Sequence, residues 1–125
     1  MKNTERRKYQ RVEANIKTSF HPKGENQSYP SLIINMSQGG MLLKSERAFP
    51  LDLVLMVKIV KGQFSPKDLF IPAQINRCET IYDGQLYHLA VEIKRNKKDI
   101  CEAVDKFYFN VLEWKKKDSE ERLKN

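Results

Sequence analysis

The sequence has little that would place the protein in a membrane. No apolar run comes close to the roughly 20 residues that a membrane-spanning helix needs, and the charged N-terminus lacks the apolar stretch of a secretory signal. Its two cysteines, Cys78 and Cys101, match no zinc-binding spacing and are too few for a disulfide framework. We therefore expect a cytoplasmic protein with no membrane span.

The sequence also lacks the common motifs of catalysis. It contains no G-x-S-x-G, no Walker loop that binds phosphate and no Cys-His pair. The carboxylates are scattered, so nothing marks a catalytic pair or a cluster of metal ligands. We predict a protein that is not an enzyme, with no catalytic residue, no metal site and no cofactor.

What the sequence does contain is basic charge. The 125 residues carry a formal net charge of +7 and have a pI of about 9.4, which indicates an anionic partner. This length is typical of one domain with a hydrophobic core. Basic side chains gather in residues 1–11, which we interpret as a flexible N-terminal arm.

Three arginines of this arm form a recognisable pattern. Arg7 and Arg11 form R-x-x-x-R, and Arg6 comes directly before it. In an extended chain, four residues span about 13 Å and return the side chain to the same face. Guanidinium groups bind phosphate oxygens, or the O6/N7 edge of guanine, with two hydrogen bonds. The pair is suited to gripping both ends of an anionic ligand, and the alternative is a solvated basic terminus.

A second polar motif, Asn-Met-Ser-Gln-Gly-Gly at residues 35–40, lies between two apolar runs. It is typical of two strands joined by a turn at Gly39 and Gly40. If the first strand continues to Ser37, the side chains of Asn35 and Ser37 share a face and form a polar wall for a ligand. The alternative is that both side chains bond their own backbone and only shape the turn, which this stretch alone favours.

Most of the remaining chain alternates between apolar and polar residues, as half-buried strands do. Strands are expected over 12–20, 29–36, 41–45, 51–59, 69–79 and around 87–93. Asp83-Gly84 is a hairpin signal before the last of them. The alternation places Leu51 and Leu55 in the core. Antiparallel strands at this spacing predict a small barrel or sandwich over residues 12–95.

After the last strand the apolar period changes to 3.6 residues, which predicts a helix over residues 96–117. Asn96 is placed to cap this helix. Its apolar stripe consists of Ile100, Val104, Phe107, Tyr108, Val111 and Leu112. We expect the helix to cover the barrel or close its mouth, and residues 118–125 to form a charged tail. Phe109 and Trp114 lie off this stripe or at its end, and either pack at its edge or contact a partner or a second subunit of a homodimer.

Taken together, the two polar motifs resemble the signature of the PilZ domain family. That signature is R-x-x-x-R, followed after roughly twenty to thirty residues by [D/N]-x-S-x-x-G. Its positions are filled here by Arg7, Arg11, Asn35, Ser37 and Gly40. Arg6 fits the frequent R-R start of the family, whereas Ala90 stands where glycine is usual. The resemblance extends from residue 5 to about residue 112.

This resemblance implies a mainly β fold, a six-stranded antiparallel barrel with a C-terminal helix, that binds the bacterial second messenger cyclic di-GMP. The implied ligand residues are Arg6, Arg7, Arg11, Asn35, Ser37, Gly39 and Gly40. By analogy with the family, Arg6 favours a stacked pair of messenger molecules. We expect the arm to fold over the ligand and the protein to transmit the signal to a downstream protein that no motif identifies.

Two other functions stay open. The first is a protein-interaction module of PilZ fold that does not bind the messenger, although the intact motifs argue against it. The second is a small barrel that binds nucleic acid, although the strands lack a clear stripe of aromatic residues interleaved with Lys and Arg. A salt titration separates the second from a messenger receptor, because extended binding to nucleic acid weakens by orders of magnitude with salt.

Overall fold

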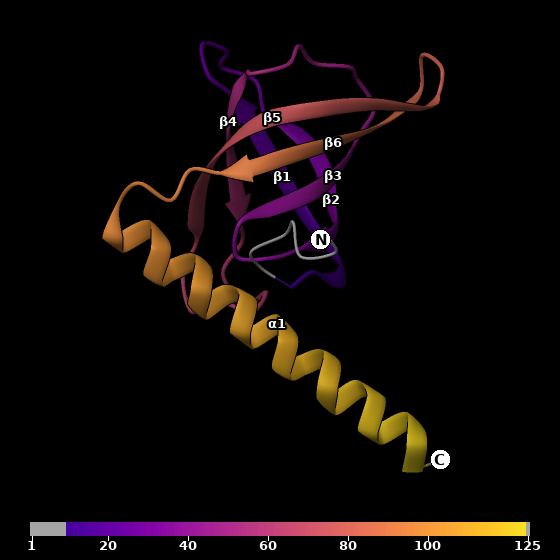
Figure 1. Cartoon of the computed structure of the whole chain (residues 1–125), viewed down its shortest axis with the longest axis vertical. Coiled ribbons are helices and arrows are strands. Elements are labelled where there is room, and N and C mark those ends of the chain that lie inside the picture. Colours follow the sequence, from indigo (N-terminus) through magenta and orange to yellow (C-terminus); the bar gives the residue numbers. More distant parts are fainter. Residues whose placement is uncertain (1–9, 125) are drawn as a thin grey trace, which may run out of the picture.

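Six antiparallel strands form a closed barrel, and one long helix follows them (Figure 1). The computed structural model describes residues 10–124. The elements are β1 (Val12–Pro22), β2 (Tyr29–Met36), β3 (Gly40–Ser45), β4 (Val54–Ile59), β5 (Leu69–Tyr82), β6 (Leu86–Ile93) and α1 (Lys98–Lys124). The strand order around the barrel is β1-β2-β3-β6-β5-β4, and β4 pairs with β1 to close it. The predicted fold class is confirmed.

The barrel interior is filled by the side chains that alternate inward along the strands. They are almost entirely aliphatic or aromatic. The most deeply covered include Phe20, Ile33, Leu43, Leu55, Val57, Ile71, Ile75 and Leu89. Burying one such side chain stabilises the fold by about 1.5–3 kcal/mol. The alternating pattern is therefore the main reason that this sequence closes into a barrel.

Leu51 is a correction to the predicted core. Its exposed fraction is 58%, whereas that of Leu55 is 1%. The chain turns at Asp52, whose φ is 70°, and the regular strand starts only at Val54. The backbone N–H of Asp52 donates to the carbonyl of Ile75 at 2.8 Å. The alternation of β4 therefore does not extend back to Leu51, which faces solvent.

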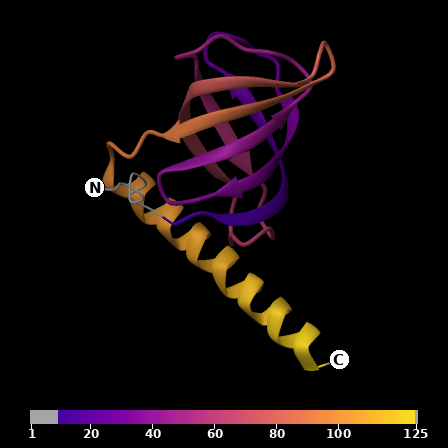
Figure 2. The ribbon, with the colours of Figure 1, turned by 45° about the vertical axis from the view of Figure 1, so that its right-hand side comes forward.

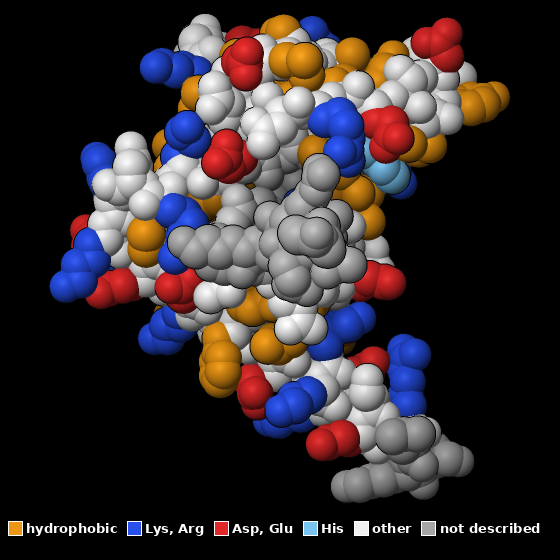
Figure 3. Space-filling view, viewed as in Figure 1, with side chains coloured by type: hydrophobic (Ala, Val, Ile, Leu, Met, Phe, Trp, Pro, Cys, Tyr) orange, Lys and Arg blue, Asp and Glu red, His pale blue; other side chains and the backbone are white. Residues whose placement is uncertain are grey.

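The hairpin of β5 and β6 extends beyond the barrel (Figure 1). Its turn contains Asp83 and Gly84, as predicted, and Gly84 has a φ of 74° that suits glycine. Ile81 and Tyr82 are exposed near the tip. Figure 3 shows hydrophobic side chains at this projection. The hairpin is thus longer than the core requires.

Helix α1 lies across one end of the barrel, as Figures 1 and 2 both show. The backbone N–H of Cys101 donates to the carbonyl of Lys97 at 3.0 Å, so Lys97 occupies the N-cap position in place of the predicted Asn96. The helix face that meets the barrel buries Val104, Phe107, Tyr108 and Val111. The expected covering of the barrel by the apolar stripe is therefore found.

The helix ends at Lys124, beyond the predicted boundary at residue 117. Glu, Lys and Arg are good helix formers, and Arg122 pairs with Asp118 one turn earlier at 3.2 Å. Residues of the predicted charged tail thus continue the helix past the barrel (Figure 2).

Trp114 packs edgewise on Phe64 with a centroid distance of 5.6 Å. Among residues 10–124, no helix is both long and apolar enough to cross a bilayer.

Candidate functional site

A groove of about 550 Å³ lies on the outer face of the barrel. Arg11 and Asn35, one from each predicted motif, line it. The full lining consists of Arg11, Val12, Glu13, Asn35, Leu42, Asn76, Arg77, Ala90 and Val91. The predicted site residues Arg6 and Arg7 lie outside the residues that the structure describes. The tertiary structure thus brings together two segments of the predicted site.

The groove follows a row of cross-strand neighbours. Glu13 pairs with Asn35, Asn35 with Leu42, Leu42 with Ala90, and Ala90 with Arg77. This row crosses β1, β2, β3, β6 and β5 in their order around the barrel. Its ends are polar or charged, and its centre is apolar. An elongated ligand with polar ends and a flat apolar middle would match this pattern.

Irregular pairing turns Asn35 and Arg77 of this row outward. A β-bulge adds one residue to a strand and re-aims the neighbouring side chain, and bulges are common beside binding sites. Asn15, at the irregularity of β1, has a φ of 54°. The register shifts lie between Glu13 and Ile16 in β1, between Ile33 and Asn35 in β2, and between Ile75 and Arg77 in β5. In β2 and β5 two successive residues at the shift therefore lie outside the core, whereas the burial in β1 still alternates.

Arg11 is held at the start of β1 by Asn35. Its Nη1 donates to Oδ1 of Asn35 at 2.7 Å, a short and charge-assisted hydrogen bond. Gly40 lies beside this pair. A Cβ on Gly40 would be 2.7 Å from the carbonyl oxygen of Val91 and 3.6 Å from Nη2 of Arg11. Glycine is required here because β3 approaches the backbone of β6 too closely for any side chain.

Ser37 shapes the turn between β2 and β3. Its hydroxyl accepts a hydrogen bond from the N–H of Gly39 at 3.1 Å, and its own N–H donates to the carbonyl of Gly40 at 2.9 Å. The side chain is 4% exposed, and β2 ends one residue earlier, at Met36. Ser37 therefore does not continue the face of Asn35, and Ser37, Gly39 and Gly40 are absent from the groove lining. The hydroxyl of Ser37 thus bonds the backbone of its own turn, which is the second of the two alternatives given by the sequence.

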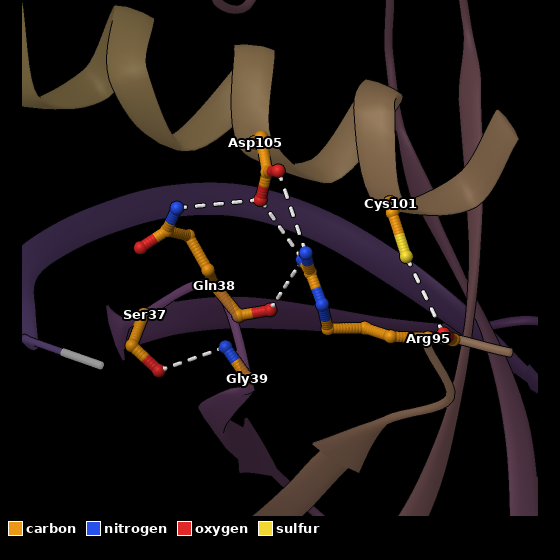
Figure 4. A network of polar contacts seen from close by, with 6 residues as sticks. All are labelled: Ser37, Gln38, Gly39, Arg95, Cys101 and Asp105. Atoms are coloured by element: carbon orange, nitrogen blue, oxygen red, sulfur yellow. Dashed lines mark hydrogen bonds and ion pairs between the residues drawn. The ribbon is translucent and has the colours of Figure 1, made fainter. Parts of the chain in front are cut away.

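Polar contacts join this turn to the helix (Figure 4). Nη1 of Arg95 donates to the carbonyl of Gln38 at 3.0 Å and forms an ion pair with Asp105 at 2.9 Å. Nε2 of Gln38 donates to the same carboxylate at 3.3 Å. The thiol of Cys101 donates to the carbonyl of Arg95 at 3.3 Å. The turn of the second motif is thus fixed to the first half of α1.

The helix also contacts the residue before Arg11. The hydroxyl of Tyr108 donates to the carbonyl of Gln10 at 2.8 Å. Burial raises the pKa of Tyr108 above its ordinary value of 10.0. Since Tyr108 follows Asp105 by three residues, both contacts lie on one face of α1. One helix face therefore touches both segments that carry the predicted motifs.

Sequence reasoning missed Glu13, Asn76 and Arg77 as groove residues. A signal for Arg77 was nevertheless present. Regular alternation over the predicted strand 69–79 places Ile75 inside the barrel and Arg77 inside as well. An unpaired arginine is almost never fully buried. Its appearance at an inward position indicates that the strand carries a bulge.

Within the described part of the chain, no group of His, Cys, Asp and Glu side chains is arranged to hold a metal ion.

Comparison with known proteins gives the relatives of this chain. A family model described as the PilZ domain matches residues 5–110. The chain is similar in structure to the PilZ domain of YcgR from Escherichia coli with c-di-GMP, with a TM-score of 0.71, 16% identity, and coverage of 93% of this chain and 98% of that one. The comparison with curated protein sequences found no match.

Two further solved structures share the fold. The PilZ domain of CeSA from a cellulose-synthesizing bacterium has a TM-score of 0.62 and 15% identity, covering 80% of this chain and 95% of that chain. The complex of MrkH from K. pneumonia with c-di-GMP has a TM-score of 0.67 and 16% identity. That match covers 91% of this chain but only 56% of MrkH, so this chain spans about half of that protein.

Proposed function

Because the chain belongs to the PilZ domain family, we propose that it binds cyclic di-GMP in the groove and passes this signal to a downstream protein. The observation that carries the proposal is the hydrogen bond between Arg11 and Asn35, which joins the two signature motifs inside the groove. The volume of about 550 Å³ also falls in the range of about 300–1,000 Å³ that is typical of small-molecule sites.

The chemistry of the ligand suits an arginine that is already oriented. Cyclic di-GMP presents two phosphates and two guanine edges, and a guanidinium binds either kind of group with two parallel hydrogen bonds. The bond to Asn35 fixes the guanidinium of Arg11 in the unliganded protein. Less side-chain entropy is then lost when the ligand binds. Gly40 contributes indirectly, because its lack of a side chain leaves space next to Arg11.

The remaining predicted residues complete the proposed site. Arg7 binds the ligand together with Arg11, and Arg6 lies on a base of a second, stacked messenger molecule. Ser37 and Gly39 keep the turn after β2 in shape through their mutual hydrogen bond, and they reach the ligand only if the turn adjusts. The ratio of ligand to protein reports on the role of Arg6, since one site then holds two molecules.

Helix α1 is the proposed route of the signal. Tyr108 bonds the carbonyl next to Arg11, and Asp105 bonds the turn of the second motif. A ligand that moves either segment therefore strains or relaxes contacts on the same face of the helix. The part of α1 that extends past the barrel then presents the change to the downstream protein (Figure 2).

Calorimetric titration with cyclic di-GMP tests the proposal, because it returns affinity and stoichiometry together. We expect Arg11→Ala to weaken binding by roughly 30- to 150-fold, or about 2–3 kcal/mol, since it removes a charge-assisted bidentate contact. The thermal stability should stay nearly unchanged. The matched control is Arg122→Ala, because this arginine has an 81% exposed side chain near the far end of α1.

Three outcomes would contradict the proposal. The first is no saturable binding of cyclic di-GMP to the full chain at tens of micromolar. The second is unfolding of Arg11→Ala, which would make this arginine structural. The third is equal loss of affinity in Arg11→Ala and Arg122→Ala, which would indicate unspecific attraction between a basic protein and an anion.

A further inference from the structure

The groove has a second arginine, Arg77. In β5, Ile75 points into the core with 0% exposure, and Cys78 packs against the core as well. Asn76 and Arg77 between them are both exposed. Two successive outward residues are possible because the register shifts between Ile75 and Arg77. Asn76 is thus the additional residue of the bulge, and its insertion turns Arg77 into the groove.

The pairing sets how far Arg77 lies from Asn35 along the barrel. Arg77 pairs with Ala90, Ala90 with Leu42, and Leu42 with Asn35, which holds Arg11. Neighbouring strands are about 4.8 Å apart, so the three steps from Asn35 to Arg77 span roughly 14 Å. Arg77 therefore enters the groove from a strand three steps away from Asn35, and both arginines line the same groove.

The surroundings of Arg77 leave its donors available to a ligand in the groove that it lines. Within residues 10–124 it makes no ion pair or side-chain hydrogen bond, in contrast to Arg47 and Arg95, which are engaged with protein groups. The groove floor beside it consists of the small side chain of Ala90 and the apolar side chain of Leu42. A flat base can lie on such a floor with its edge toward Arg77.

We propose, on the premise that the groove binds cyclic di-GMP, that Arg77 is a specificity-determining residue that donates to the O6 and N7 atoms of the guanine lying over Leu42 and Ala90. Guanine presents two adjacent acceptors on this edge, whereas adenine presents N7 beside an N6 amino donor. A guanidinium can therefore donate to both acceptors of guanine. In adenine, the N6 amino donor would face one of its N–H groups, and that hydrogen bond cannot form. The bulge at Asn76 is the structural cause of this selectivity.

The test is a cycle of two proteins and two ligands, measured by calorimetry on the full chain. The proteins are the wild type and Arg77→Ala, and the ligands are cyclic di-GMP and its 7-deaza analogue, which lacks the N7 acceptors. We expect Arg77→Ala to weaken binding of cyclic di-GMP roughly 10- to 100-fold. The loss caused by the deaza change should be clearly smaller in Arg77→Ala than in the wild type, because the contact is already gone.

Lys44→Ala is the matched control, since Lys44 is an exposed cation on β3 outside the groove. It should leave both affinities within about twofold of the wild type, as general charge has only a weak, screened effect. Arg77→Gln serves as a second variant if Arg77→Ala does not fold, and the same reduced effect of the deaza change is expected for it.

The outcomes separate the two proposals. If the wild type does not bind cyclic di-GMP, the proposed function fails and this inference fails with it. If the wild type binds and Arg11→Ala does not, but Arg77→Ala binds as well as the wild type, only the role of Arg77 is overturned. If Arg77→Ala binds more weakly but the deaza change costs both proteins the same, Arg77 contacts a phosphate and the guanine assignment is overturned.

Discussion

One end of the barrel is closed by packed aromatic rings, whereas the opposite end is covered by helix α1, which adds polar contacts to its buried apolar face. At the first end Phe20, Tyr29 and Phe49 pack with ring centroids 5.3–5.7 Å apart. Arg47 lies over the ring of Tyr29 at 5.1 Å and donates to its hydroxyl at 2.7 Å. Such rings bury a large apolar area and fix one another in place. This end therefore serves stability.

At the opposite end, polar contacts accompany the apolar packing of α1, and they involve segments next to the groove. Arg95 and Asp105 hold the turn at Gln38, and Tyr108 holds the carbonyl of Gln10. Exposed or partly exposed polar contacts contribute little net stability each, but they are directional. The polar contacts at this end therefore position nearby groups, and each contact is weak enough for a bound ligand to change it.

An arginine alone does not identify a binding site. Arg47 and Arg11 are both held by a neighbouring oxygen at 2.7 Å. Arg47 also covers the rings of Tyr29 and Phe49, so its guanidinium completes the closed end. Arg11 instead lines an open groove. What surrounds the guanidinium, and not its nearest hydrogen bond, separates the structural role from the proposed binding role.

The largest effect is expected from Phe20→Ala at the aromatic end. Phe20 is 1% exposed and contacts both Tyr29 and Phe49, so its removal leaves a cavity. We expect a loss of about 3–5 kcal/mol in the free energy of unfolding, measured with urea. The control is Phe70→Ala, which removes a 57% exposed ring and should cost less than about 1 kcal/mol. Where Phe20→Ala still folds, its affinity for cyclic di-GMP should equal that of the wild type; a selective loss of affinity would break the division between the two ends.

A smaller and mixed effect is expected from Gly40→Ala. The new Cβ would lie 2.7 Å from the backbone oxygen of Val91, so β3 or β6 has to shift. We expect about 1–3 kcal/mol of destabilisation, as for overpacked cores, together with weaker binding because the same shift disturbs Arg11. Gly84→Ala is the control. It should destabilise by about 1–2 kcal/mol through the positive φ of 74° alone, and should leave binding intact. Equal affinities of the two variants would show that Gly40 has no connection with the site.

The smallest effect is expected from Tyr108→Phe, which removes the hydrogen bond to Gln10. The loss in the free energy of unfolding should be about 0.5–1.5 kcal/mol at neutral pH. Because the folded pKa of Tyr108 is raised above 10.0, the folded state retains this proton more strongly than the unfolded state. The stability that this tyrosine provides is present below pH 10 and is lost as the pH rises through the folded pKa.

The pH dependence gives this last prediction its control. Above pH 10, the free energy of unfolding measured with urea should fall more steeply with pH for the wild type than for Tyr108→Phe. The hydrogen bond to Glu25 raises the pKa of Tyr29 as well, but Tyr29 is present in both proteins and does not affect the difference. Tyr82→Phe, at a 62% exposed position, should behave as the wild type does. A parallel decline in all three proteins would mean that Tyr108 does not couple to the fold.

Much of the fold could be predicted from local patterns. Alternation located the strands, Asp83-Gly84 located a hairpin turn, and the 3.6-residue period located the helix face around Val104 and Phe107. The family suggested by the two motifs is confirmed by the match over residues 5–110. These features are local, because each follows from the residues within one or two turns or strands.

The site was only partly predictable. The motifs pointed to Arg11 and Asn35, which meet in the groove, but not to Arg77. The end of α1 at Lys124 was also missed, because the change to a charged composition does not stop a helix made of good helix formers. For Ser37, the sequence left two roles open: part of a polar wall for the ligand, or a residue that shapes the turn. The hydrogen bond from the N–H of Gly39 to its hydroxyl agrees with the second role.

The period of each element, the basic charge and the two motifs can be read directly from the residues. Which side chains meet depends on how the folded chain is packed. Regular alternation predicts an inward Arg77, and the bulge that reverses it arises from pairing with β6. Arg11 meets Asn35, and Tyr108 meets Gln10, across sequence separations of 24 and 98 residues. Register and packing depend on contacts between strands that lie far apart in the chain, and no local period encodes such contacts.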